Sequence, residues 1–164
     1  MRRGGIFRYG RAAVALAVLL VCMASVAMPY TPDGLIPAKE ESVEELKARL
    51  SNTSIGERSQ ICLQIAQKQL DAADKLYAAT ESEKAQAALG EVTSFAEMAR
   101  DYAIKSRKHQ KQTEILVRRM AHKLNDLKHS VVHDDQAAVQ SAMAKLQRIS
   151  DDLLYSMFPK AQQP

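Results

Sequence analysis

The chain has 164 residues, of which 46% are hydrophobic and 5% aromatic, and it holds 23 Lys and Arg against 19 Asp and Glu. Four of the basic residues are arginines within the first 11 positions, so the chain beyond residue 27 has 19 basic and 19 acidic residues. The net charge of +4 therefore does not indicate a nucleic-acid partner. Only Cys62 remains beyond residue 27, which excludes an intramolecular disulfide and a cysteine-based zinc module there.

Residues 1–27 have the composition of a secretory signal peptide. An arginine-rich start is followed by an apolar run over 12–28 without a charged residue, and the small residues Ser25 and Ala27 stand at the −3 and −1 positions of a cut after Ala27. The mature chain is then expected in the periplasm or outside the cell. The alternatives are an uncleaved leader that anchors the chain in the inner membrane and a lipoprotein modified at Cys22.

Residues 28–53 are expected to form a linker that ends in a short helix. The stretch MPYTPDGLIPAKEES contains three prolines and has no helical period. Ser42 precedes Glu45 by three residues, which is typical of a capping box and predicts a helix over 42–52. The same spacing of Ser54 and Glu57 predicts the next helix, over 55–79.

The third predicted element is one unbroken helix over 81–130, about 75 Å long at 1.5 Å per residue. Thr80 and Glu83 suggest its start, and neither Gly nor Pro occurs between 91 and 133. A heptad row runs through it without a change of phase, although its centre is polar: Ala85, Leu89, Val92, Ala96, Ala99, Ala103, Ser106, Gln110, Thr113, Val117, Met120, Leu124, Leu127 and Val131. Asp134 and Asp135 then indicate the start of a last helix over 135–157.

These elements predict an all-α fold of antiparallel helical hairpins that share one long central helix. The helical-bundle domain is expected over 54–158, followed by a C-terminal tail over 159–164. Each hairpin has one helix too few for a closed core, so the missing surface must come from a second chain, in a homodimer, or from a bend near Gln110 that folds the halves into a four-helix bundle. Because no helix-breaking residue lies near that point, the straight helix and the homodimer are the predictions.

Positive charge is concentrated in the middle of the predicted central helix. Residues 105–130 hold eight Lys and Arg against two Asp and Glu, and the densest part carries Lys105, Arg107, Lys108 and Lys111. The pattern is typical of a solvated helix face. It also fits a docking surface for an anionic component of the cell envelope, such as phospholipid head groups or an acidic protein.

A cluster of histidines near the end of this helix raises a second hypothesis. At 100° per residue, His122, Asp126, His129 and His133 share one narrow face, and imidazole and carboxylate are suitable ligands for zinc, copper or nickel. That face lies opposite the apolar row and is therefore turned to solvent. The alternative function is thus a periplasmic metal-binding or metal-sensing protein.

The sequence contains no pattern that predicts catalysis. A Gly-rich phosphate loop, a nucleophile elbow, His-Glu-x-x-His and the haem-attachment pattern CxxCH are all missing from it. Cys62 falls on the apolar side of its helix, so we expect a buried thiol and no nucleophile. The prediction is an exported, non-enzymatic, helical interaction or scaffold protein of the cell envelope that binds no cofactor and has a protein partner or a second copy of itself.

Overall fold

The computed structural model describes residues 41–159. The predicted signal peptide, the Pro-containing part of the linker and residues 160–164 lie outside the described residues. Between 41 and 159 the chain forms five helices and no strand: α2 (Val43–Asn52), α3 (Ile55–Ala78), α4 (Ser82–Ser106), α5 (Gln110–Ser130) and α6 (His133–Met157). The all-α prediction is confirmed for this part of the chain.

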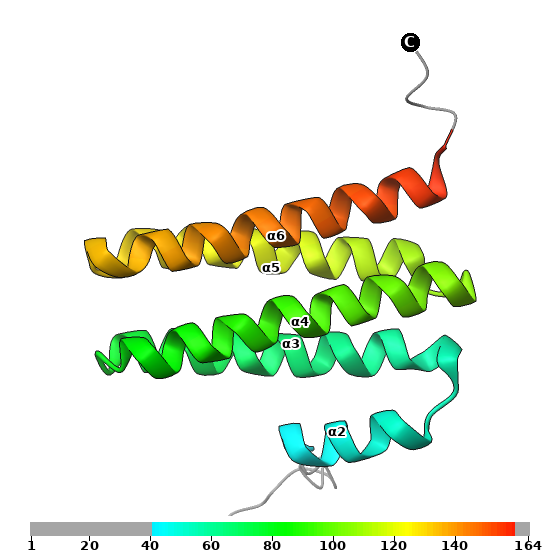
Figure 1. Ribbon diagram of the computed structural model, residues 1–164, viewed down its shortest axis with the longest axis horizontal. Helices are drawn as coiled ribbons and strands as arrows, with labels where there is room; N and C mark the ends of the chain where they lie inside the picture. The colour runs from blue at the N-terminus through cyan, green and yellow to red at the C-terminus, as the bar shows by residue number, and fades with distance from the viewer. Residues whose placement is uncertain (1–40, 160–164) are drawn as a thin grey trace, which may run out of the picture. The chain divides into compact units, whose positions relative to one another are not determined.

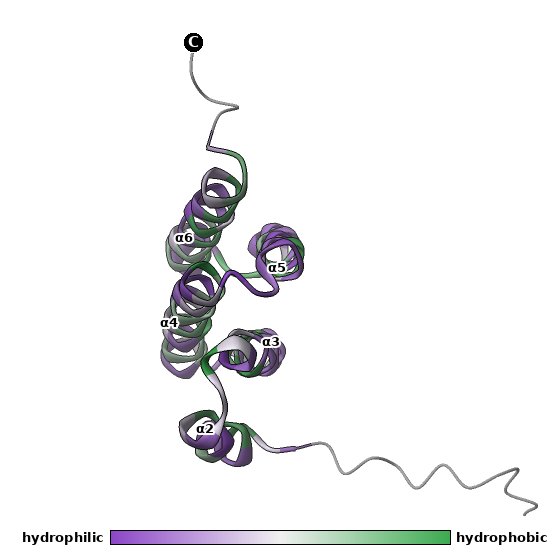
Figure 2. Ribbon diagram, turned by 90° about the vertical axis from the view of Figure 1, so that its right-hand side faces the viewer, coloured by the Kyte–Doolittle hydropathy of each residue, from purple (hydrophilic) through white to green (hydrophobic). Residues whose placement is uncertain are grey.

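The four long helices are arranged as two antiparallel hairpins that pack on each other. Helices α3 and α4 form the first hairpin, and α5 and α6 form the second (Figure 1). Figure 2 shows that α4 and α6 lie in one layer while α3 and α5 lie in the other. Within residues 41–159, no helix combines the length and the apolar character needed to cross a membrane.

The prediction of one unbroken helix over 81–130 is wrong. Helix α4 ends at Ser106 and α5 begins at Gln110. Of the three residues between them, Arg107 and His109 have positive φ angles of 54° and 60°. The chain therefore folds back near Gln110 into a four-helix bundle, which is the arrangement that the sequence disfavoured. Helix α2 packs on α3, so the short helix of the predicted linker contacts the bundle.

The reversal between α4 and α5 uses local hydrogen bonds in place of Gly or Pro. The Ser106 hydroxyl donates to the carbonyl oxygen of Tyr102 at 2.7 Å and accepts from the backbone N–H of Lys108 at 3.2 Å. A left-handed conformation costs a non-glycine residue roughly 1–2 kcal/mol. Packing the two hairpins together buries several large side chains, each worth about 1.5–3 kcal/mol, so the burial outweighs the strain of two such residues.

The apolar row that predicted a long helix is nevertheless a core row on both sides of the turn. Leu89 and Val92 of α4 and Val117 and Leu124 of α5 are buried in a single apolar cluster, which also contains side chains of α3 and α6. Because both halves of the row are covered within one chain, α4 and α5 do not have the exposed apolar surface from which a homodimer was predicted.

Of two helix starts predicted from capping patterns, one is capped as predicted and the other is not. Ser42 and Glu45 form the predicted capping box: the Ser42 backbone N–H donates to the Glu45 carboxylate at 2.8 Å, and the Glu45 backbone N–H donates to the Ser42 hydroxyl at 3.2 Å. Thr80, in contrast, does not cap α4. It has a φ of 59° and closes α3, since the backbone N–H of Glu81 donates to the carbonyl oxygen of Leu76 at 2.9 Å.

Candidate interaction surface

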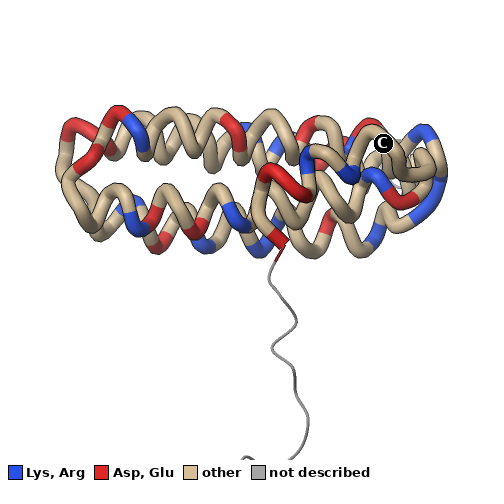
Figure 3. The backbone as a smooth tube through the Cα atoms, turned by 90° about the horizontal axis from the view of Figure 1, so that it is seen from below, with Lys and Arg blue, Asp and Glu red and all other residues tan. Residues whose placement is uncertain are grey.

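The four basic residues singled out in the sequence lie together where α4 turns into α5. We call Lys105, Arg107, Lys108 and Lys111 the basic turn. All four are exposed, and none of them forms an ion pair with an acidic residue in the part of the chain that the structure describes. Figure 3 shows Lys and Arg gathered at this end of the bundle. The basic turn is thus a solvent-facing concentration of uncompensated positive charge.

Side chains of neighbouring helices hold the basic turn in place. The Gln60 amide nitrogen on α3 lies 3.1 Å from His109 Nδ1 and donates to Gln112 Oε1 at 3.3 Å. The Gln110 amide nitrogen donates to the Ser156 hydroxyl of α6 at 3.4 Å. These contacts fix the turn against both layers of the bundle, so its charges are presented on a supported backbone.

A close approach to Gly56 also positions Lys108. A Cβ atom at residue 56 would lie 2.8 Å from Lys108 Cδ, so the missing side chain of the buried Gly56 leaves room for the lysine methylenes. The Lys108 stem thereby crosses the start of α3 while its ammonium group stays at the surface.

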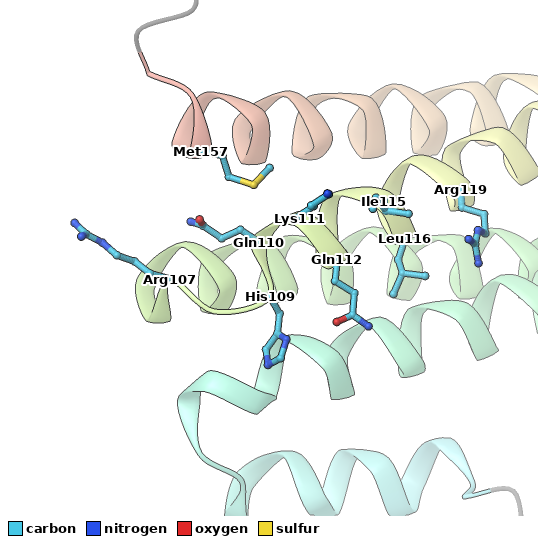
Figure 4. Close-up of a pocket in the computed structure, with 9 residues that line it drawn as sticks. All are labelled: Arg107, His109, Gln110, Lys111, Gln112, Ile115, Leu116, Arg119 and Met157. Carbon is cyan, nitrogen blue, oxygen red and sulfur yellow. The ribbon is translucent and has the colours of Figure 1, made fainter.

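A shallow groove of about 680 Å³ lies beside the basic turn, along the first half of α5 (Figure 4). Its lining combines basic, neutral polar and apolar side chains and includes no Asp or Glu: Arg107, His109, Gln110, Lys111, Gln112, Ile115, Leu116, Arg119 and Met157. Ile115, with 43% of its surface exposed, is one of the few large apolar residues that the described chain leaves open to solvent. We call this feature the α5 groove.

The cations of the α5 groove differ from two other cations on α5. Arg107, Lys111 and Arg119 form no hydrogen bond or ion pair within residues 41–159 through their side chains. By comparison, Arg118 pairs with Glu114, and Lys123 pairs with Asp71 at 2.5 Å. The first turn of α5 carries no acidic residue either, so the positive end of its helix dipole adds to the local potential.

The four residues of the proposed metal site lie on two helices. His122, Asp126 and His129 are exposed on α5, which ends at Ser130, whereas His133 is the exposed first residue of α6. Among the described residues, no group of three or more His, Cys, Asp and Glu side chains is arranged to hold a metal ion. The face that a continuous helix through residue 133 would have formed is interrupted by the turn between α5 and α6.

Two titratable groups inside the bundle are shielded from solvent. Cys62 is fully buried, as its position on the apolar side of α3 predicted, and burial raises the pKa of its thiol to about 11. Burial also raises the pKa of Tyr77, and the negative charge of Asp135 raises it further. Neither group is placed as a surface nucleophile or base.

Sequence reasoning found the basic turn but missed the α5 groove. Arg119, Ile115 and Leu116 were assigned to the second half of a straight helix, and Met157 reaches the groove only because the chain folds back. One signal was available: Ile115 stands four residues from both Lys111 and Arg119, so the three share a helix face that is too basic to be core.

Comparison with models of protein families, with curated proteins and with solved structures finds no match.

Proposed function

We propose that this chain is an exported, non-enzymatic, helical interaction protein of the cell envelope, which docks on an anionic partner through its basic turn. The observation that carries this proposal is the set of four exposed cations at the α4–α5 turn, which have no ion-pair partner among the described acids. Uncompensated charge of one sign on a rigid support attracts partners of opposite charge and speeds their association.

The lack of a paired nucleophile and base in the α5 groove supports the non-enzymatic part of the proposal. The lining contains no Ser, Thr, Cys, Asp or Glu, so His109 and Lys111, which could transfer a proton, have no hydroxyl, thiol or carboxylate partner there. The thiol of Cys62 lies in the core, where burial raises its pKa to about 11 and disfavours the reactive thiolate. A scaffold role needs neither group.

Export is supported by the sequence of residues 1–27, which combines four arginines, an apolar run and small residues before a cut after Ala27. Mass spectrometry of the protein recovered from the producing cells tests this part. We expect a mature chain that begins at Met28. Recovery of the chain with an intact Met1 would show that the leader is retained as an anchor.

Docking through the basic turn is tested by site-specific photocrosslinking in those cells. A photoreactive amino acid at Lys108 should give a defined adduct, because this side chain belongs to the proposed contact surface. The same amino acid at Lys145, an exposed cation on α6, serves as the matched control. The Lys105→Glu variant should lower the yield of the adduct at 108. Equal adducts at both positions, or none at either, would contradict the proposal.

A further inference from the structure

The α5 groove carries positive charge at both of its ends and apolar surface between them. Lys111, Ile115 and Arg119 follow one another at four-residue intervals, so they lie along one face of α5. Eight residues at 1.5 Å per residue place the Cα atoms of Lys111 and Arg119 about 12 Å apart along the helix axis. Figure 4 shows Ile115 and Leu116 between Lys111 and Arg119, with Met157 of α6 near the Lys111 end.

The separation of the cations argues against a small single anion as the occupant. To contact both cations, a phosphate or carboxylate group would have to draw the two side chains together over Ile115, which lies between them on the helix face. An amphiphile with one head group places its charge at one end only, and it would leave the cation at the other end beside an acyl chain. The charge pattern instead fits a ligand with two acidic groups that flank an apolar group.

The walls of the groove indicate which conformation such a ligand takes. They are formed by α5, the turn before it and the end of α6, and they offer no strand edge with which an extended peptide could pair its backbone N–H and C=O groups. Gln112 and Gln110 each use one hydrogen bond within the fold, to Gln60 and Ser156. A helix forms its backbone hydrogen bonds internally, so it needs only apolar contacts and charge pairs from the groove.

On this basis, and building on the proposed function, we propose that the α5 groove binds an acidic amphipathic helix of a partner protein. Two carboxylates of this helix, about two turns apart, pair with Lys111 and Arg119, and an apolar side chain between them packs on Ile115 and Leu116. Arg107, which has no partner in the described chain, extends the positive charge at the Lys111 end. The groove thus specifies a partner by the order acid, apolar residue, acid.

A designed peptide tests this inference with the full chain. The probe is a fluorescent, alanine-based helical peptide with Glu at positions i and i+8 and Leu at i+4. This pattern reads the same in both directions, so the result does not depend on the orientation of the bound helix. We expect saturable binding by fluorescence anisotropy, weakened at least tenfold when Gln replaces both Glu or when Ala replaces Leu in the peptide.

Variants of the protein locate the contact. Arg119→Glu and Ile115→Asp should each weaken binding at least tenfold, whereas Lys145→Glu, which makes the same charge change on α6, should alter it less than twofold. Both groove side chains are exposed, and unchanged thermal unfolding confirms that each variant is folded. A peptide with Lys in place of one Glu should recover binding to Arg119→Glu, because the new pair is attractive again.

Several results would overturn the inference. One is no binding of the probe. Another is binding that Ile115→Asp and the Leu-to-Ala peptide leave unchanged, which would mean diffuse charge attraction outside the groove. A third is displacement of the probe by vesicles with 30% phosphatidylglycerol but not by neutral vesicles, which would make the membrane the occupant. Photocrosslinking at Lys108 is independent of these measurements, so docking by the basic turn can succeed while the groove inference fails.

Discussion

The Ser82 hydroxyl donates a 2.6 Å hydrogen bond to Oδ2 of Asp135, although 53 residues separate the two in the chain. Gln86 donates to the other carboxylate oxygen, Oδ1, at 3.0 Å. Asp135 is only 4% exposed, so both of its oxygens are withdrawn from water and satisfied by the first turns of α4. This carboxylate therefore joins the start of α4 to the start of α6 and ties the two hairpins together at one end.

We predict that Asp135→Asn lowers the free energy of unfolding by about 1.5–3 kcal/mol, the usual range for a lost hydrogen bond to a charged group. In this variant the amide NH2 group would face either the Ser82 hydroxyl or the Gln86 amide nitrogen, where the carboxylate offers an acceptor. Asp134→Asn is the matched control: that residue is exposed and should lose only its interaction with the helix dipole, about 0.3–1 kcal/mol. Urea unfolding measures both. Equal losses would show that the link between the hairpins contributes nothing.

Replacing Thr80 with glycine should stabilise the fold. A β-branched residue at a φ of 59° carries roughly 1–2 kcal/mol of strain, which glycine avoids. Glycine also increases the entropy of the unfolded chain by about 0.4–1 kcal/mol. We therefore expect Thr80→Gly to raise the free energy of unfolding by about 0.5–1 kcal/mol. Ala78→Gly, two residues earlier in the last turn of α3, should lower it by about 1 kcal/mol because helical φ angles favour alanine. A loss of stability in Thr80→Gly would contradict this account.

The helices and their core faces were predictable because helical periodicity is a local property of the sequence. Leu89 of α4 and Leu124 of α5, for example, lie on the predicted apolar row and are buried. The capping box at Ser42 was predictable for the same reason, since it involves residues only three positions apart.

The turn between α4 and α5 could not be predicted from local pattern. Arg107 and His109 adopt left-handed conformations that are uncommon for residues other than glycine, and no Gly or Pro marks the position. What stabilises them is the packing of hairpin on hairpin, which depends on residues from the whole bundle. The polar residues Ser106, Gln110 and Thr113 at the centre of the heptad row were the sign, and Ser106 does support the turn through its hydroxyl. The α5 groove depends on this turn and was missed with it.

Cys62 should react with thiol reagents only after unfolding. The residue is fully buried, and burial raises the pKa of its thiol to about 11, so both access and thiolate population are low at neutral pH. Labelling with a maleimide, followed by mass spectrometry, should give no adduct in native protein and one adduct at this site in guanidinium chloride. Because the folded pKa is raised, unfolding should increase the rate at pH 8 through ionisation as well as exposure. Rapid labelling of the native chain, or a covalent dimer without reductant, would contradict the buried position.

Zinc binding by the histidine cluster should be weak. His122, Asp126 and His129 lie on the exposed side of α5, and His133 is exposed on the next helix, whereas strong metal ligands are usually buried and oriented by surrounding side chains. Calorimetric titration with zinc, copper and nickel should show no saturable site at micromolar metal, and His129→Ala should not change the heats. A saturable heat that disappears in His129→Ala would revive the metal-binding alternative and would require the turn at Val131 to rearrange.

The last prediction concerns cooperativity. Leu89 of α4 and Leu124 of α5 belong to one buried cluster, although a straight helix would have placed them in separate hairpins end to end. Leu89→Ala and Leu124→Ala should each cost about 2–5 kcal/mol, as truncation of a buried leucine usually does. Ile115 already has 43% of its surface exposed, so Ile115→Ala should lower the free energy of unfolding by less and serves as the apolar control. Calorimetry should show a single transition that each leucine variant shifts as a whole, with equal calorimetric and van't Hoff enthalpies. Two transitions, each lowered by only one of the leucine substitutions, would mean that the hairpins unfold independently and that the fold-back at Arg107 and His109 does not join their cores.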